Sequence, residues 1–260
     1  MQNDQIDQVS KEEAKQIQEH GAVEEAHRVP PDGATMKMDL HCHTEASWDC
    51  ITPIEVILAQ CQKEGIQVQA ITDHNEIWGA KALKALAEND PDCNITIIVG
   101  EEITTTEGEI IGLFLEEQIE AGLTPEETVR RIRADNGLVL LPHGFDPLKR
   151  LRLKPEARER IAGELDIIET FNARVSRPHW NQVAVDYAEK HGLLLSAGSD
   201  AHRLEDIGAA WVEVPRQPIQ GPEELLQALK GGVPVGKWTP PIWAFILKMW
   251  GWAKKLLGFT

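Results

Sequence analysis

Residues 39–44 read Asp-Leu-His-Cys-His-Thr and continue a short apolar segment. Side-chain direction in an extended segment repeats every two residues, so His41 and His43 are expected to point the same way. A second pair with this spacing, Asp200 and His202, follows another apolar run. Two such pairs at the ends of distant strands indicate that these ends meet at one site.

Between the two pairs, short apolar runs alternate with helical patterns. Strands are predicted at residues 36–40, 68–72, 95–100, 110–115, 138–142, 165–171, 193–198 and 209–214. Thr52 and Thr124 are predicted helix N-caps, because each is followed by Pro and then by Glu three residues after the cap. Strands that are apolar on both faces and separated by helices indicate a parallel sheet covered on each side. We expect a closed barrel, with an open doubly wound sheet as the alternative.

Metal-ligating residue types follow the other predicted strands as well. His74, Glu102 and His143 each come directly after an apolar run. In a parallel barrel the carboxyl ends of the strands converge on one face. Mixed imidazole and carboxylate ligands suit Zn, Mn or Fe better than Mg or Ca. The candidate ligands are His41, His43, Asp49, His74, Glu102, His143, Asp200 and His202.

Eight candidate ligands imply two or three divalent ions, since one ion with an open position needs only about three protein ligands. Closely spaced ions indicate attack by a metal-bound hydroxide on a phosphorus or carbonyl centre. Substrate phosphate would need cations, and Arg174, Arg177 and Arg203 follow strand ends, as do the cations of residues 149–152. Arg174 lies closest to a strand end, and one arginine can bind two phosphate oxygens at once in a bidentate contact. Asp73 and Glu169 are candidates for orienting the imidazoles.

These residues, in this order, resemble the polymerase and histidinol phosphatase (PHP) family of metal-dependent phosphoesterases. The resemblance covers residues 36–214 and rests on the segments DLHCHT, ITDHN, GEEIT, LPHGFD, IETFNAR and GSDAH. It implies an α/β fold, a distorted barrel of seven βα units with a two- or three-metal site at the carboxyl ends of the strands. It also implies that the eight candidates are ligands, that Glu102 bridges two ions, and that a phosphoester is hydrolysed. We expect a small phosphorylated substrate, namely a nucleotide, a nucleoside bisphosphate or a sugar phosphate.

Two positions depart from the pattern of many family members. Where those members place a further histidine after the bridging glutamate, this chain reads Glu107-Gly108-Glu109. Glu109 is therefore either a replacement ligand or a solvated hairpin carboxylate. Asp49 stands where some members have histidine, and it is either a ligand or an ordinary loop residue.

Composition limits the possible partners and location. The 260 residues carry a formal net charge of −16, which argues against broad binding of duplex nucleic acid. The four cysteines form no Cys-x-x-Cys pair, and the first residues lack the apolar run of a signal peptide, so we expect a cytoplasmic protein. Three parts are expected: a flexible leader (1–35), a catalytic barrel (36–235) and an amphipathic C-terminal helix (236–260).

The expected C-terminal helix differs in composition from the rest of the chain. It contains four of the eight tryptophans and four lysines, and it has no acidic residue. Such a helix could lie peripherally at an anionic membrane surface. Packing on the barrel, or self-association with a second copy of the chain, is the alternative.

Two other functions stay open. An amidohydrolase-type barrel that cleaves C–N or C–O bonds also begins with His-x-His, but such enzymes commonly bridge their metals with a modified lysine. Here the corresponding strand end has Glu102. The second alternative is a non-catalytic, metal-stabilised scaffold that recruits partners through its tryptophan-rich tail.

Overall fold

The structure is a computed structural model that describes residues 35–240. Residues 1–34 of the expected leader and residues 241–260 of the expected C-terminal helix lie outside the described residues. No helix within residues 35–240 is long and apolar enough to cross a membrane. The helices are α2 (Ile54–Glu64), α3 (Trp78–Asn89), α4 (Pro125–Ala134), α5 (Pro155–Ile161), α6 (His179–His191) and α7 (Pro222–Leu229), with short 3-10 turns η1 (Ala162–Glu164) and η2 (Leu204–Asp206).

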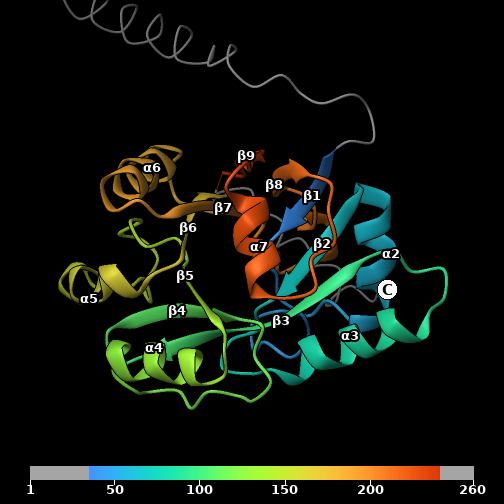
Figure 1. Ribbon diagram of the computed structural model, residues 1–260, viewed down its shortest axis with the longest axis horizontal. Coiled ribbons are helices and arrows are strands. Elements are labelled where there is room, and N and C mark those ends of the chain that lie inside the picture. The colour runs from blue at the N-terminus through green and yellow to red at the C-terminus, as the bar shows by residue number, and fades with distance from the viewer. Residues whose placement is uncertain (1–34, 241–260) are drawn as a thin grey trace, which may run out of the picture. The chain divides into compact units, whose positions relative to one another are not determined.

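The described strands form a single nine-stranded sheet in the order β7-β6-β5-β4-β3-β2-β1-β8-β9. Their bounds are β1 (Thr35–Asp39), β2 (Ile66–Ile71), β3 (Thr96–Thr105), β4 (Gly108–Leu113), β5 (Leu138–Leu141), β6 (Ile167–Asn172), β7 (Leu194–Gly198), β8 (Ala210–Pro215) and β9 (Val233–Gly236). Strands β1, β2 and β3 pair in parallel, as do β5, β6 and β7. The sheet curls round, and α2 to α6 lie on its outer side (Figure 1).

The sheet is joined across its open side just beyond the carboxyl ends of β1 and β7. The chain that leaves β1 runs beside the chain that leaves β7, with a parallel bridge between Cys42 and Ala201. Three backbone hydrogen bonds join the two segments: Leu40 N to Ala197 O (3.2 Å), Asp200 N to His41 O (2.8 Å) and His43 N to Ala201 O (3.0 Å). The first and the seventh strand therefore meet at the end of the barrel where the predicted ligands lie.

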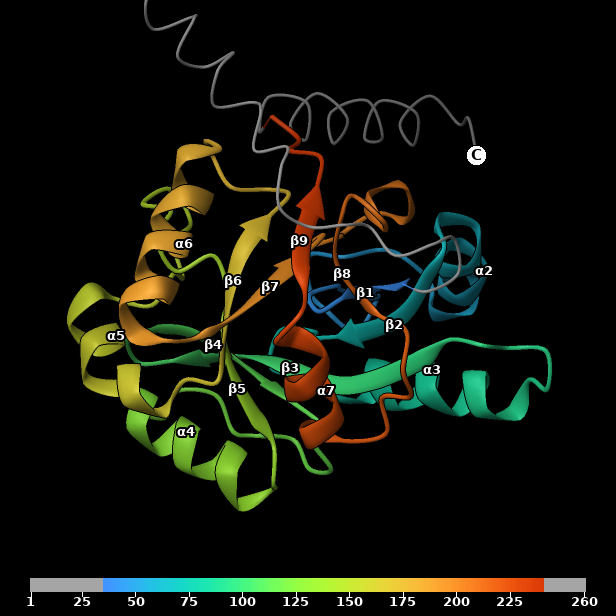
Figure 2. The same ribbon diagram turned by 45° about the horizontal axis from the view of Figure 1, so that its top comes forward.

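Two apolar clusters fill the fold. One lies inside the curled sheet and contains Met38, Leu40 and Ile98. Helix α7 contributes to this inner cluster through Leu225 and its neighbours, and it lies across the ring of strands (Figures 1 and 2). The other cluster lies between the strands and the outer helices. Strands buried on both faces explain the nearly continuous apolar runs in the sequence.

The α/β barrel expected from the sequence is confirmed, but its strands do not form seven regular βα units. Strand β4 is antiparallel to both β3 and β5, so the hairpin predicted through Glu107-Gly108-Glu109 is part of the barrel wall. Strand β8 is antiparallel to β1 and to β9. Strand β9 was not predicted, because its sequence Val-Pro-Val-Gly is short and contains proline.

Of the two predicted N-caps, one is confirmed. The Thr124 hydroxyl accepts a hydrogen bond from the Glu127 amide (3.2 Å) at the start of α4. The prediction for Thr52 was wrong, since Pro53 holds the cap position of α2 without a side-chain hydrogen bond. Instead the Glu45 carboxylate, from the loop after β1, accepts a hydrogen bond from the Ile54 amide (3.2 Å).

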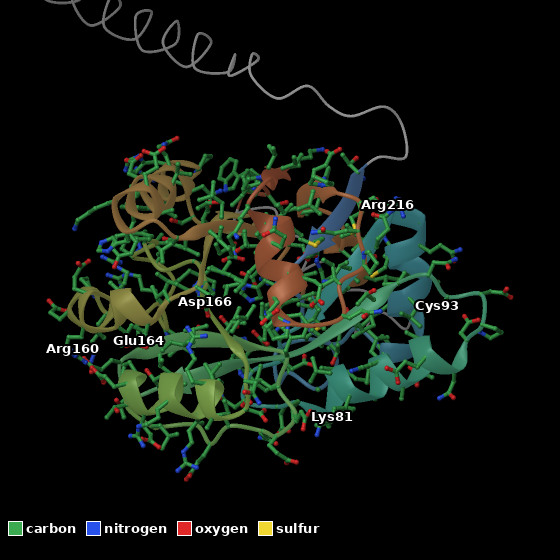
Figure 3. All side chains as sticks on the ribbon, in the orientation of Figure 1. Lys81, Cys93, Arg160, Glu164, Asp166 and Arg216 are labelled. Carbon is green, nitrogen blue, oxygen red and sulfur yellow. The ribbon has the colours of Figure 1, made fainter. Side chains whose placement is uncertain are left out.

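Asp166 ties the middle strands of the barrel together. Its carboxylate accepts a hydrogen bond from Val139 N (2.8 Å) in β5 and pairs with Arg133 of α4 (2.7 Å). The same arginine donates to the Glu164 carbonyl (2.8 Å), and Figure 3 shows Glu164 and Asp166 side by side before β6. These contacts hold the start of β6 beside β5 and α4.

We expect Thr124→Ala to lower the free energy of unfolding by about 1 kcal/mol, because it leaves the first turn of α4 without its side-chain acceptor. Thr124→Ser retains the hydroxyl and should remain close to the parent. Urea denaturation followed by circular dichroism measures both. Equal stability of the alanine and serine variants would show that the cap contributes nothing.

Candidate metal centre

All eight predicted ligand residues lie at the carboxyl ends of the strands and form one connected cluster. They come from the segments after β1, β2, β5 and β7 and from β3 itself. Most are fully buried, whereas Asp49, His74 and His202 lie at the more accessible side. Four overlapping groups could each hold a metal ion: His43–His74–His202, His41–His43–Glu102, His41–His143–Asp200 and His74–Glu102–Glu109.

Glu102 lies at the middle of the cluster. Its Oε2 atom is 3.4 Å from His41 Nε2 and 3.5 Å from His43 Nε2. The same oxygen is 3.2 Å from His74 Nδ1. The other oxygen, Oε1, is 3.0 Å from His143 Nε2. One carboxylate thus faces four imidazoles, which is the arrangement expected of a bridging ligand.

Asp49 and Asp200 face the imidazoles from the other sides. Asp49 Oδ2 is 3.1 Å from His202 Nε2, and its Oδ1 is 3.6 Å from His74 Nε2. Asp200 Oδ1 is 3.6 Å from His43 Nε2 and 3.5 Å from His202 Nδ1. Asp49 therefore belongs to the cluster and does not project into solvent as an unrelated loop residue.

Glu109 joins the cluster from β4. Its side chain is 3% exposed, and Oε1 is 3.4 Å from His74 Nδ1. The antiparallel register places Glu109 opposite Thr104, and its amide donates to the Leu151 carbonyl (2.7 Å). A solvated hairpin carboxylate, one of the two sequence interpretations, is thus not what the structure contains.

Two ligand candidates have backbones in the left-handed region. His143 has φ of +25° and Asp200 has φ of +51°. Such conformations are costly for residues other than glycine and persist where surrounding contacts enforce them. For Asp200 one such contact is the hydrogen bond from its amide to His41 O (2.8 Å). Both side chains are thereby turned toward the cluster.

Glu169, within β6, orients part of the cluster from behind. Its Oε1 accepts from His41 Nδ1 (3.0 Å), and its Oε2 accepts from the His143 amide (2.7 Å) and from Asn172 Nδ2 (3.0 Å). Gly198 allows this approach, because a Cβ there would lie 2.3 Å from Glu169 Oε1. The predicted role of Glu169 in orienting an imidazole agrees with this contact.

Asp73 acts through the loop that follows β1. Its carboxylate accepts from Thr44 N (2.6 Å), Thr44 Oγ1 (2.8 Å) and Ser47 Oγ (2.8 Å). Ser47 Oγ in turn lies 3.0 Å from His43 Nδ1 and accepts from the His74 amide (3.0 Å). Ser47 was not identified from the sequence, since a serine in a polar loop carries no distinguishing signal.

Charges within the cluster shift its pKa values in opposite directions. Burial alone would raise the pKa of Glu102, but His41, His143 and His74 hold that pKa well below its usual range. Burial likewise opposes ionisation of Asp200, yet Lys149, His41 and Arg174 keep its pKa well below normal. Burial disfavours protonated His74, but Glu109 and Glu102 raise its pKa to about 9.

The donor set fits divalent metal ions. Several buried oxygen and nitrogen atoms that could ligate a metal ion have no hydrogen-bond partner in the described structure: Asp49 Oδ1, His74 Nδ1, Glu102 Oε2, Glu109 Oε1 and His143 Nδ1. Buried polar atoms are normally paired, and leaving them unpaired is costly. Imidazole nitrogens and carboxylate oxygens at these separations are the ligands that Zn, Mn and Fe prefer.

The predicted substrate-binding arginines differ in position. Arg174 Nη1 donates to the Asp200 carbonyl (2.9 Å) and contacts the His202 ring, so it lies at the cluster. Arg203 pairs with Asp206 through Nε (3.0 Å), and Arg177 is exposed in the loop before α6. A further cation, Lys149, contacts the Asp200 carboxylate from the loop after His143.

Comparison with known proteins agrees with this geometry. The profile of a family described as PHP domain matches residues 39–195, and a profile described as PHP-associated matches residues 178–234. An uncharacterised protein of Methanocaldococcus jannaschii is 36% identical over 194 residues, which cover 73% of this chain and 75% of that protein. A Haemophilus influenzae protein described as a 5'-3' exoribonuclease is 33% identical over 107 residues, 38% of each chain.

Among solved structures, a two-domain protein from Bacteroides vulgatus shares the fold. It contains a predicted PHP-like metal-dependent phosphoesterase, and the two structures match with a TM-score of 0.62 at 18% sequence identity. The match covers 78% of this chain and 65% of that protein. At this identity the likeness concerns the fold alone.

We expect MnCl2 to raise the thermal unfolding midpoint of chelator-treated protein, because the ion satisfies buried donors only in the folded state. At about 100 times the dissociation constant the gain is about 2.7 kcal/mol. Differential scanning calorimetry measures it. His41→Asn should reduce the shift, whereas His179→Asn, at an exposed position on α6, should retain it. A parent midpoint insensitive to Mn, Zn and Fe would contradict the metal centre.

Proposed function

The chain belongs to the PHP domain family, and on this premise we propose that it is a metal-dependent phosphoesterase acting on a small phosphorylated substrate. Nucleotides, nucleoside bisphosphates and sugar phosphates are the candidate substrates. The observation that carries the proposal is the buried cluster around Glu102, with unpartnered donor atoms and with Lys149 and Arg174 beside it. Metal-ligating groups and phosphate-binding cations thus converge on one site.

We assign the metal-ligand role to the eight clustered residues predicted from the sequence and add Glu109 to them. Two or three ions of Mn, Zn or Fe would fit this number of ligands, and Glu102, which faces four imidazoles, would be the carboxylate that they share. When bound, such ions supply positive charge at the phosphate and lower the pKa of the attacking water. Glu169 keeps the His41 ring turned so that Nε2 faces the cluster, through its contact with Nδ1 (3.0 Å).

Arg174 and Lys149 are proposed to hold the substrate phosphate. Both cations contact Asp200, so they lie within reach of a phosphate placed beside that carboxylate. A metal ion held by Asp200 would offset the charge of that carboxylate, and Lys149 and Arg174 would then be available to phosphate oxygens. Arg174 offers a planar fork of donors, which suits orientation of the phosphate, and Lys149 offers a mobile point charge.

The two alternative functions make different demands on the same site. An amidohydrolase-type enzyme commonly has a modified lysine as its metal bridge, but here Glu102 lies between the imidazoles and Lys149 reaches Asp200 from a loop. A non-catalytic scaffold would bind metal and hydrolyse no phosphoester. The complete ligand set and the adjacent cations favour the catalytic proposal.

We expect hydrolysis of phosphate monoesters that is lost on chelation and restored by Mn, Zn or Fe. Arg174→Ala should lower kcat/KM by about 10- to 100-fold, the loss expected for a charge-assisted contact. Arg131→Ala, on the outer surface of α4, is the matched control. Phosphate release from a panel of monoesters measures these effects. Activity that survives chelation, or equal activity of the two variants, would contradict the proposal.

We expect Glu109→Gln to weaken metal binding by about 10-fold or more, because it removes a charged donor facing His74. Glu107→Gln changes the same hairpin but affects a carboxylate that pairs with Arg160 of α5, so its metal affinity should match the parent. Equilibrium dialysis with metal analysis provides the measurement. If both variants bind metal as tightly as the parent, Glu109 is not a ligand.

A further inference from the structure

We propose that Trp48 selects substrates that carry a planar aromatic ring, by stacking on that ring beside the metal centre. This inference rests on the proposed phosphoesterase function and narrows its substrate class to phosphoesters that bear a nucleobase. Trp48 is thereby a specificity-determining residue, outside the ligand set and outside the phosphate-binding cations.

The position of Trp48 distinguishes it from an ordinary exposed apolar residue. Its side chain is 79% exposed, and it directly precedes Asp49 of the candidate centre. Single exposed hydrophobic residues are common and need no explanation by themselves. Here the largest apolar side chain of the loop stands at the accessible side of the cluster, where Asp49 faces His74 and His202.

Hydrogen bonds on both sides of Trp48 hold its loop. Before it, Ser47 donates from its hydroxyl to Asp73 (2.8 Å) and from its amide to Thr44 O (3.0 Å). After it, Cys50 donates from its amide to Ser47 O (3.2 Å) and from its thiol to His202 O (3.3 Å). A loop held in this way presents the indole without a large ordering cost on binding.

The indole of Trp48 faces the imidazole of His74. The two ring centroids are 6.0 Å apart and the ring planes differ by 29°, so one face of Trp48 lies toward the imidazole. The high exposure of the side chain leaves other indole surface open to solvent. A phosphate held at the cluster therefore brings the rest of its substrate past Trp48.

Nucleobase stacking is the interaction that such a surface provides. Stacking of a base on an aromatic side chain strengthens binding by about 5- to 150-fold, equivalent to about 1–3 kcal/mol. Every base has an aromatic face, so we expect little preference among bases. A sugar phosphate has no aromatic ring to stack on Trp48, and this difference is the basis of the test.

The test compares adenosine 5'-monophosphate and uridine 5'-monophosphate with ribose 5-phosphate, using the full chain loaded with Mn. Trp48→Ala should lower kcat/KM for both nucleotides by about 5- to 150-fold and leave ribose 5-phosphate within about twofold. Trp48→Phe should recover much of the loss. Trp78→Ala, which changes a 48%-exposed tryptophan at the start of α3, is the matched control and should behave as the parent.

Equal losses on nucleotides and ribose 5-phosphate would overturn the proposal, because they would show that Trp48 only supports His74. Unchanged nucleotide kinetics would also overturn it. If Trp48→Ala keeps the nucleotide kinetics of the parent but no longer sediments with anionic phospholipid vesicles as the parent does, Trp48 belongs to a membrane-binding surface instead.

Equilibrium dialysis of the same three compounds separates this proposal from the phosphoesterase function. If the parent hydrolyses none of them but binds the nucleotides more tightly in a Trp48-dependent manner, hydrolysis fails and the stacking role stands. If it binds nucleotides and ribose 5-phosphate equally, the stacking role is wrong.

Discussion

The backbone ladder between residues 40–43 and residues 197–201 is the constraint on which the site depends. It joins the first strand to the seventh and places His41 and His43 beside Asp200. Each of these side chains belongs to a short segment without helical or hairpin support of its own. Their convergence therefore follows from closure of the barrel, and the positive φ of Asp200 persists because its amide is held by His41 O (2.8 Å).

The same closure concentrates charge in a region that excludes water. Burying carboxylates and imidazoles together is costly unless their polar atoms are hydrogen-bonded, and in this cluster several carboxylate oxygens and imidazole nitrogens have no hydrogen-bond partner. Glu169 and Asp73 compensate part of this cost by fixing His41 and the loop around Ser47. The atoms that stay unpaired explain why a divalent cation suits the cluster, because a bound cation would satisfy them. This need for a cation agrees with the metal dependence described for PHP-like proteins.

Much of the site could be predicted because metal-ligating residue types stand directly after apolar runs. In a parallel barrel the strand order alone brings such positions to one face. Ser47 could not be assigned in this way, since it reaches the cluster from an irregular loop whose path depends on tertiary contacts. Lys149 was one of several candidate cations after His143, and the path of its loop decides that it contacts Asp200. Glu109 was ambiguous for a related reason. A hairpin glutamate is buried or solvated according to how the hairpin packs, and β4 packs between β3 and β5.

Residue types and apolar periodicity are local properties, and they were enough to predict the α/β class, the available chemistry and the strand ends that carry ligands. Closure of the sheet into a barrel, with β4 and β8 antiparallel, is established by the three-dimensional structure. So are the contact of Arg174 with Asp200, the pairing of Arg203 with Asp206, and the exposed position of Trp48 beside His74. These features depend on contacts between residues far apart in the chain, and a local sequence pattern does not show which of those contacts form.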